Sequence, residues 1–349
     1  MMNFDSRKYV GLRFGLSVSA PDEDDPDWPK ALGDKNRAVN RFVYDEANNF
    51  LLEGARLVLG HSWKDSLGRW DEDGILNHLA RDARIFRQLR PEKPDPITGI
   101  VPPPILNFLA WPDQPPPVSE ALARRLVQQG LIQILQVLPR GMEDVLPDLE
   151  ADGEKAKAFS QTDLGQFARI RALTSMRREL VRQTEYRLFV GGPGINLNTM
   201  MSAPAGARRL PGIVEEAIFS HEAGQPLFVS SALGGTAKAI ADTLLQRKLK
   251  MNADRAFITA PEVAELMTRM SEKYPISDIL EGPSVRGGWN AEDYFGKLSL
   301  NLDLLAKNAG LDTDGYVQML ATPILDVAMG WMLSGVSNLR GLVRPGQFH

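Results

Sequence analysis

The stretch from Leu173 to Gly235 restricts the fold more than any other part of the chain. Two short apolar runs lie in it, Leu188–Val190 and Leu227–Val229, and each run ends in small residues. A helical pattern over Gly212–Glu222 separates the two runs. A strand, a helix and a second strand in this order predict a βαβ unit whose turns are built from glycine.

The chain before this stretch repeats the alternation of strand and helix. We predict strands at Val10–Ser19, Ala55–Leu59, Ile105–Trp111 and Leu131–Leu138, and helices at Asn36–Glu53, Gly74–Gln88, Glu120–Gln129, Thr162–Thr184 and, after the last strand, Thr236–Gln246. Parallel neighbours need crossover connections, which are usually helices. The sequence therefore predicts an α/β fold, with a doubly wound, mostly parallel, Rossmann-like sheet.

The last hundred residues show no convincing strand pattern. Helical spacing recurs at Pro261–Tyr274 and Leu298–Ala309. A longer apolar run, Met319–Val336, contains Pro323 and Asp326, and an acid at the middle of a span is costly in lipid. We predict a buried amphipathic helix there and no membrane segment. The expected domains are 1–250, which binds a ligand, and 251–349, a helical extension packed on it.

Composition and charge exclude several classes of protein. The 40 basic and 44 acidic residues give a net charge of -4, so nucleic acid is not an expected partner. The chain has no cysteine, which removes disulfides, thiolate zinc sites and thiol nucleophiles together. The N-terminus shows no apolar signal segment, and we expect a cytoplasmic protein.

Small and polar residues follow the predicted strands. In a doubly wound sheet, ligands lie beyond the carboxyl ends of the strands, where the strand order reverses. The residues expected on this rim are Ser17, Ser19, Gly60, His61, Trp111, Gly191, Gly192, Gly234 and Gly235. Small residues let a backbone approach a phosphate, and a helix N-terminus supplies free N–H donors. The pattern predicts a nucleotide or nucleotide-sugar pocket, although glycines that only make tight turns remain an alternative.

Several enzyme signatures are absent from the sequence. It contains no P-loop, no clean G-x-G-x-x-G and no G-x-S-x-G elbow, which disfavours P-loop NTPases, nicotinamide dehydrogenases and serine hydrolases. The four histidines, His61, His78, His221 and His349, show no metal-ligand spacing. The acidic run Asp22–Asp27 is expected to be a solvated loop. We predict no metal site and no cofactor.

One order of residues resembles a known family. Arg177 and Arg178 lie in a predicted helix, Gly191 and Gly192 follow the next strand, and Pro-Gly-x-x-Glu-Glu at 211–216 opens the next helix. This order is similar to the signature of the SLOG superfamily, which groups cytokinin-activating LOG phosphoribohydrolases, DprA and the ligand-sensing domains found beside TIR and Sir2 effectors. The resemblance covers residues 9–245, and GLSVSAPDED, ARLVLG and QPLFVSSALGG are similar to bacterial SLOG proteins of defence islands.

The resemblance implies a ligand site at these positions. Glu216 takes the place of the motif glutamate, with Glu215 beside it, and both are candidate catalytic carboxylates. Pro211, Gly212, Arg177 and Arg178 become candidate ligand contacts. Adjacent helical residues point about 100° apart, so we expect only Glu216 to reach the pocket. Acids that merely favour the first helical turn, and arginines on a solvated helix face, remain the alternative interpretation.

The chain also departs from the LOG pattern. The connection Pro193–Leu210 separates the paired glycines from Pro211, and Ile213 stands where the motif has threonine. Three functions therefore remain open. The first is a sensor of a nucleotide or NAD-derived ligand that acts on an effector protein, in bacterial antiviral defence. The second is an N-glycosidase or phosphoribohydrolase that cleaves a nucleotide or NAD. The third is a DprA-like nucleic-acid binder or an inert scaffold, and the acidic composition disfavours its DNA-binding form. The resemblance also implies a homo-oligomer.

Overall fold

Six strands form one all-parallel sheet, in the order β4-β3-β2-β1-β5-β6. The computed structural model describes residues 8–21, 25, 27–64, 69, 71–89, 94, 99–116, 121–146, 158–159, 161–193, 212–246, 266, 269–270, 272–275 and 291–341. The strands are β1 (Arg13–Ser19), β2 (Arg56–Leu59), β3 (Ile105–Ala110), β4 (Ile132–Val137), β5 (Tyr186–Gly191) and β6 (Leu227–Ser230). The predicted α/β class with a doubly wound parallel sheet is confirmed.

Helices follow each strand of the sheet, as the alternation in the sequence predicts. They are α1 (Lys35–Leu52), α2 (Ile75–Leu89), α3 (Ala121–Gln128), α5 (Asp163–Arg182), α7 (Gly212–Glu222) and α8 (Gly235–Leu244), with short 3-10 turns at Lys30–Leu32 and Glu143–Val145. Each of these helices begins and ends within two residues of its predicted bounds. The side-chain oxygens of Asp34 and Thr162 cap the first turns of α1 and α5, as N-cap residues commonly do.

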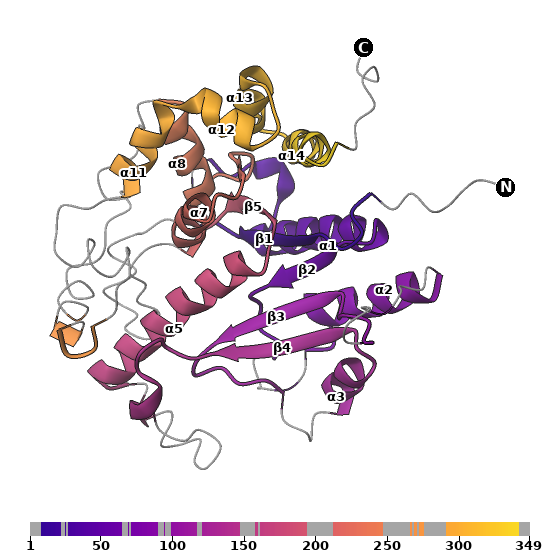
Figure 1. Cartoon of the computed structure of the whole chain (residues 1–349), viewed down its shortest axis with the longest axis vertical. Helices are drawn as coiled ribbons and strands as arrows, with labels where there is room; N and C mark the ends of the chain where they lie inside the picture. Colours follow the sequence, from indigo (N-terminus) through magenta and orange to yellow (C-terminus); the bar gives the residue numbers. More distant parts are fainter. Residues whose placement is uncertain are drawn as a thin grey trace.

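The strand order reverses between β1 and β5. The chain runs outward from β1 through β2 and β3 to β4, then returns to place β5 on the other side of β1 (Figure 1). Gly15 pairs with Arg187 and Ser19 pairs with Gly191 in this register. In doubly wound sheets such a switch point opens a crevice at the carboxyl ends of the strands.

The two faces of the sheet are covered by different helices. Phe50 of α1 and Leu79 of α2 pack with Leu57 in one large core. On the opposite face, Val58 packs with Phe167 of α5 in a second core. Helix α7 packs against α5, and its Glu216 contacts Ser17 of β1. The crevice is therefore bounded by the sheet, α5 and α7.

After the sheet domain, the described residues include the helices α11 (Ala291–Ser299), α12 (Leu302–Asn308), α13 (Thr313–Ala321) and α14 (Leu325–Leu339). They are coloured orange to yellow in Figure 1, where α11–α13 lie near α8. The buried hydroxyl of Tyr316 donates to the carbonyl of Leu227 in β6 at 2.9 Å. The C-terminal helices thus pack directly on the edge of the sheet.

Two predicted helices are each divided in the structure. The run Leu298–Ala309 is broken after Ser299, because Asn301 is not helical. The run Met319–Val336 is broken between Ala321 and Leu325. Proline disfavours the helical conformation of the residue before it, and Thr322, which precedes Pro323, is extended. Within the described ranges, no helix is both long and apolar enough to cross a bilayer.

Candidate functional site

A cavity of about 210 Å³ lies at the carboxyl ends of β1 and β5. Its lining is Leu16, Ser17, Val18, Ser19, Gly60, Leu173, Met176, Arg177, Leu180, Arg187, Gly192, Pro193, Gly212, Ile213, Glu216 and Thr236. Small-molecule pockets usually measure about 300–1,000 Å³. The space bounded by these residues is therefore smaller than a usual ligand pocket and suits a small chemical group better than a molecule of dinucleotide size.

Glu216 reaches the cavity from the first turns of α7. Its Oε2 accepts a hydrogen bond from the hydroxyl of Ser17 on β1, and another from Nη1 of Arg187 on β5 at 3.0 Å. The same Nη1 donates to Ser17 Oγ at 2.9 Å. Three residues from three elements thus form one closed polar cluster, and the Glu216 side chain remains 12% exposed. Its negative charge is offset by the adjacent guanidinium.

Glu215 is directed away from the cavity, into the contact between α7 and α5. Its Oε2 accepts from Nη1 of Arg177, and its Oε1 accepts from Thr174 Oγ1 at 3.1 Å. Arg177 also lies near Glu216, with 3.9 Å between Nε and Oε1. Gly212 makes room for this arginine, since a Cβ there would lie 2.9 Å from Nη2. Arg177 is thus a cavity residue whose charge is already paired.

Arg187 is 1% exposed although it carries a charge. Burial lowers the pKa of its guanidinium, and the Glu216 carboxylate opposes that shift. The guanidinium lies over the backbone of Gly15, where a Cβ would come within 2.4 Å of Cζ. A buried charge of this kind needs an ion pair and hydrogen bonds to be tolerated. Glu216 and Ser17 supply part of that requirement.

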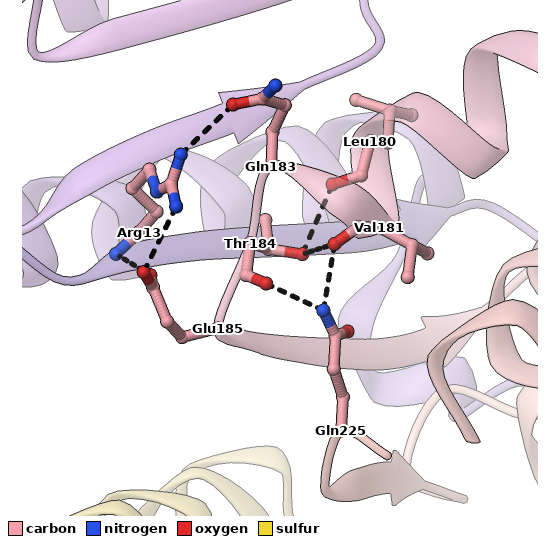
Figure 2. Close-up of polar contacts among 7 residues, drawn as sticks. All are labelled: Arg13, Leu180, Val181, Gln183, Thr184, Glu185 and Gln225. Carbon is pink, nitrogen blue, oxygen red and sulfur yellow. Dashed lines mark hydrogen bonds and ion pairs between the residues drawn. The ribbon is translucent and has the colours of Figure 1, made fainter. Parts of the chain in front are cut away.

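The turn before β5 is held at its place by residues from two other segments (Figure 2). The backbone N–H and the guanidinium of Arg13 donate to the Glu185 carboxylate, at 2.6 and 3.2 Å. From the other side, Gln225 Nε2 donates to the carbonyls of Val181 and Thr184, at 2.8 and 2.6 Å. These contacts fix the start of β5, and Arg187 follows Glu185 by two residues.

Backbone hydrogen bonds join the loops that follow β1, β5 and β6. The N–H of Gly192 donates to Ser19 O at 2.8 Å, and the N–H of Thr236 donates to Gly192 O at 3.0 Å. Gly191 has φ 65°, and a Cβ there would lie 2.4 Å from Ser19 O. Gly235 is equally confined, because its Cβ would lie 2.2 Å from Gly192 O. Only glycine suits such positions, so these two residues shape the loops from behind the cavity.

Six predicted residues besides Glu215 do not line the cavity. They are His61, Trp111, Arg178, Gly191, Gly234 and Gly235. Trp111, which we expected on the rim, is 1% exposed and packs against Phe159 in the second core. The guanidinium of Arg178 lies 4.4 Å from the centre of the Phe219 ring. Pro211 lies outside the described residues, and Ser17, Ser19, Gly60, Arg177, Gly192, Gly212 and Glu216 line the cavity.

The His61 turn is fixed by a residue that sequence reasoning missed. Asn107 of β3 is fully buried. Its Oδ1 accepts from the His61 N–H at 2.9 Å, and its Nδ2 donates to the His61 carbonyl at 2.8 Å. His61 is exposed as a whole residue, although burial lowers the pKa of its imidazole. The structure therefore gives His61 a defined backbone position near the cavity, but not a place in its lining.

Arg187 and Thr236 are cavity residues that the sequence interpretation also omitted. The Thr236 hydroxyl donates to the carbonyl of Pro193 at 2.6 Å. A signal for Arg187 was present, because buried parallel strands read as nearly continuous apolar runs. An arginine inside Tyr-Arg-Leu-Phe-Val interrupts such a run. A charge at that position indicates a specific buried partner.

Two acids of the expected solvated loop contact α8 instead. Asp25 Oδ2 accepts from the N–H of Gly235 at 3.2 Å, and Asp27 lies 3.5 Å from Lys238 Nζ. A carboxylate is stabilised at a helix N-terminus by the exposed N–H groups and the helix dipole. In the part of the chain that the structure describes, no group of three or more His, Asp or Glu side chains could hold a metal ion.

Comparison with protein families gives a match over most of the chain. The family model described as SLOG cluster2 matches residues 8–279, which is more than half of the chain. No curated protein and no solved structure matches the sequence.

Proposed function

This chain belongs to the SLOG superfamily, and from that premise we propose that it is a sensor of a nucleotide or NAD-derived ligand. The ligand binds in the cavity beside Glu216, and an effector protein responds to the bound state. A role in bacterial antiviral defence is part of the proposal and is supported only by the resemblance to SLOG proteins of defence islands.

The state of Glu216 is the observation that favours binding over catalysis. A carboxylate that stabilises a developing positive charge should present a largely uncompensated charge to the substrate. Glu216 Oε2 instead accepts from Ser17 and from Arg187 Nη1, the latter at 3.0 Å. Such a carboxylate can still accept hydrogen bonds from sugar hydroxyls through its remaining lone pairs. It is better suited to hold a ribose than to drive cleavage of the bond to the base.

Calorimetry with purified protein tests the sensor proposal. Cyclic nucleotides, ADP-ribose and NAD would be titrated, and small molecules that co-purify would be identified by mass spectrometry. Glu216→Gln should weaken binding of a ribose-containing ligand at least about tenfold, as loss of a charged hydrogen-bond acceptor predicts. Glu179→Gln is the matched control, because Glu179 pairs with Arg182 and does not line the cavity. Absence of binding by the whole panel, with no co-purifying nucleotide, would contradict the proposal.

Coupling to an effector is supported by the C-terminal helices. Leu300, Leu304 and Ile324 are large apolar side chains that remain exposed on this part of the molecule, and we propose that the effector contacts these helices. A ligand found by calorimetry should change amide hydrogen exchange in α11–α14. Slower amide exchange confined to the cavity residues would indicate a protein that binds the ligand without a response in the C-terminal helices.

An N-glycosidase is the second candidate, because a carboxylate does line the cavity. Glu216 would stabilise positive charge on the ribose during cleavage of the glycosidic bond. Release of free base or nicotinamide from a nucleotide panel, lost in Glu216→Gln and kept in Glu179→Gln, would favour it. Intact nucleotides after prolonged incubation would contradict the glycosidase and leave the sensor as the remaining proposal.

A further inference from the structure

Arg187 has two buried donors whose partners are missing among the described residues. Its Nη1 donates to Ser17 and Glu216. Its Nε and Nη2 have no hydrogen-bond partner in the part of the chain that the structure describes. Buried polar atoms in native proteins are nearly always hydrogen-bonded, and a lone exception needs a physical explanation. Two on one side chain that lines a cavity point to a ligand.

The two donors form one edge of the guanidinium group. Nε–H and one N–H of Nη2 run parallel in the plane of the group, which matches the spacing of two oxygens of a carboxylate or phosphate. The face of the group lies against Gly15, where a Cβ would be 2.4 Å from Cζ. The plane is therefore held by the strand below it, and Nη1 by Glu216. The edge is oriented before any ligand arrives.

The other two arginines are less suited to this role. Arg177 Nη1 is engaged by Glu215, which is 1% exposed. Arg178 lies over the Phe219 ring and does not line the cavity. The contact with an anion that the resemblance assigns to the basic helix is therefore better supplied by Arg187, which reaches the cavity from the sheet.

We propose that Arg187 binds an oxyanion of the ligand, a phosphate or carboxylate group, through two parallel hydrogen bonds from Nε and Nη2. This inference rests on the proposed function, because it assumes that the cavity is the ligand site. It assigns the recognition of the anion to a strand residue, and leaves Glu216 to accept hydrogen bonds from the neutral hydroxyls of the same ligand.

The Glu216 carboxylate sets the sign of the expected effects. It lies 3.0 Å from Nη1 of the same guanidinium, so it attracts Arg187 and repels an incoming anion. Glu216→Gln should therefore strengthen binding of a simple anion by several-fold, while it weakens binding of a ribose-containing ligand. The opposite responses of the two ligands distinguish anion binding by Arg187 from hydroxyl binding by Glu216.

The experiment titrates inorganic phosphate and, separately, acetate into the full-length protein and its variants. Arg187→Met alone removes the nearer cation of Glu216, at 3.0 Å, and leaves only Arg177 at 3.9 Å, so the decisive pair is E216Q and R187M/E216Q, which both lack that carboxylate. Because E216Q leaves the buried Arg187 charge without its carboxylate, the variants are compared at a temperature where circular dichroism shows each of them folded. E216Q should bind the anion, and R187M/E216Q should bind it at least about tenfold more weakly. R187K/E216Q should bind with intermediate affinity, because lysine keeps the charge and loses the planar edge. R178M/E216Q is the matched control and should behave as E216Q does.

The outcomes are distinct. Arg187-dependent binding of phosphate or of acetate supports the proposal and identifies which oxyanion is preferred. Equal anion binding by E216Q and R187M/E216Q, or no anion binding by E216Q, overturns it. If the wild-type protein still binds a nucleotide in that case, the proposed function stands and only the assignment of Arg187 fails.

Discussion

Gly15 and Arg187 are register partners on neighbouring strands, and the guanidinium of Arg187 fills the space that a side chain at position 15 would need. The absence of a side chain on β1 thus allows a charge on β5 to lie inside the protein. Since the charge is paired with Glu216 of α7, the glycine links the sheet to the helix that carries the candidate ligand contact.

Gly15→Ala should destabilise the protein by about 1–3 kcal/mol, the usual cost of overfilling a packed site. The added Cβ would lie 2.4 Å from Arg187 Cζ, so the guanidinium must move although no charge has changed. Urea denaturation measures the effect. Gly296→Ala is the control, because a Cβ there meets open space inside α11 and should be neutral or stabilising by about 0.5–1 kcal/mol. Equal stability of the Gly15→Ala variant and the wild type would contradict the packing.

Arg177→Met should cost about 3–5 kcal/mol of unfolding free energy, because it leaves the buried carboxylate of Glu215 unpaired. Both side chains of this pair are at most 6% exposed. Arg182→Met, on the same helix, removes the cation of a pair whose arginine is 68% exposed, and should cost no more than about 1 kcal/mol. Chemical denaturation of the two variants provides the comparison. Similar losses from both would show that burial does not govern this pair.

Stability should fall at alkaline pH, in part through Tyr316. Burial raises the pKa of its hydroxyl above the ordinary value of 10.0, while an unfolded tyrosine titrates near about 10. The folded state therefore holds the proton more tightly, and the stability that Tyr316 contributes is complete below about pH 10 and lost as pH rises above it. Tyr316→Phe should lower stability at about pH 8 by about 1 kcal/mol and reduce the further loss between about pH 8 and pH 11.

The same variant tests the proposed extension at 251–349. Because the Tyr316 hydroxyl donates to Leu227 of β6, an unfolding transition shared by the sheet and the C-terminal helices should shift as one unit. Two separate transitions in calorimetry, of which only one responds to Tyr316→Phe, would indicate that the helices unfold independently of the sheet.

Asn107→Leu should make the turn at His61 more mobile without leaving a cavity in the core. Leucine has a similar size, but it removes both side-chain hydrogen bonds to the His61 backbone. We expect faster amide hydrogen exchange at His61 and a loss of about 1–3 kcal/mol. The Gly296→Ala protein serves again as a control, with unchanged exchange at His61. Unaltered exchange in Asn107→Leu would mean that other contacts hold the turn.

The fold could be predicted from the sequence more completely than the candidate site. Apolar runs such as Leu227–Val229 and helical spacings such as Gly212–Glu222 are local patterns, and their alternation alone predicts a parallel sheet. The split at Pro323 was also a local signal, since proline restrains the residue before it, and it was given too little weight. These features depend on neighbours in the chain.

The composition of the cavity depends on contacts between distant segments. Ser17 and Glu216 are 199 residues apart, and Arg187 meets Ser17 across 170 residues. Small residues at strand ends indicated the rim, but they did not separate Gly192, which lines the cavity, from Gly235, which supports a loop. The same pattern does not show that the side chain of Trp111 packs in the second core and not on the rim. Only the three-dimensional register distinguishes these cases.

The register of Gly15 with Arg187 also limits what a short motif can identify. A chain that shares only the stretch from Leu173 to Gly235 would have Arg177, Arg187, Glu215 and Glu216, yet it would not necessarily have a glycine on β1 at the position where Arg187 lies. Any larger residue at position 15 would change no charged residue, and it would still displace the Arg187 guanidinium. Whether a related chain has the same pocket is therefore better judged from a glycine at the position of Gly15 than from the charged residues themselves.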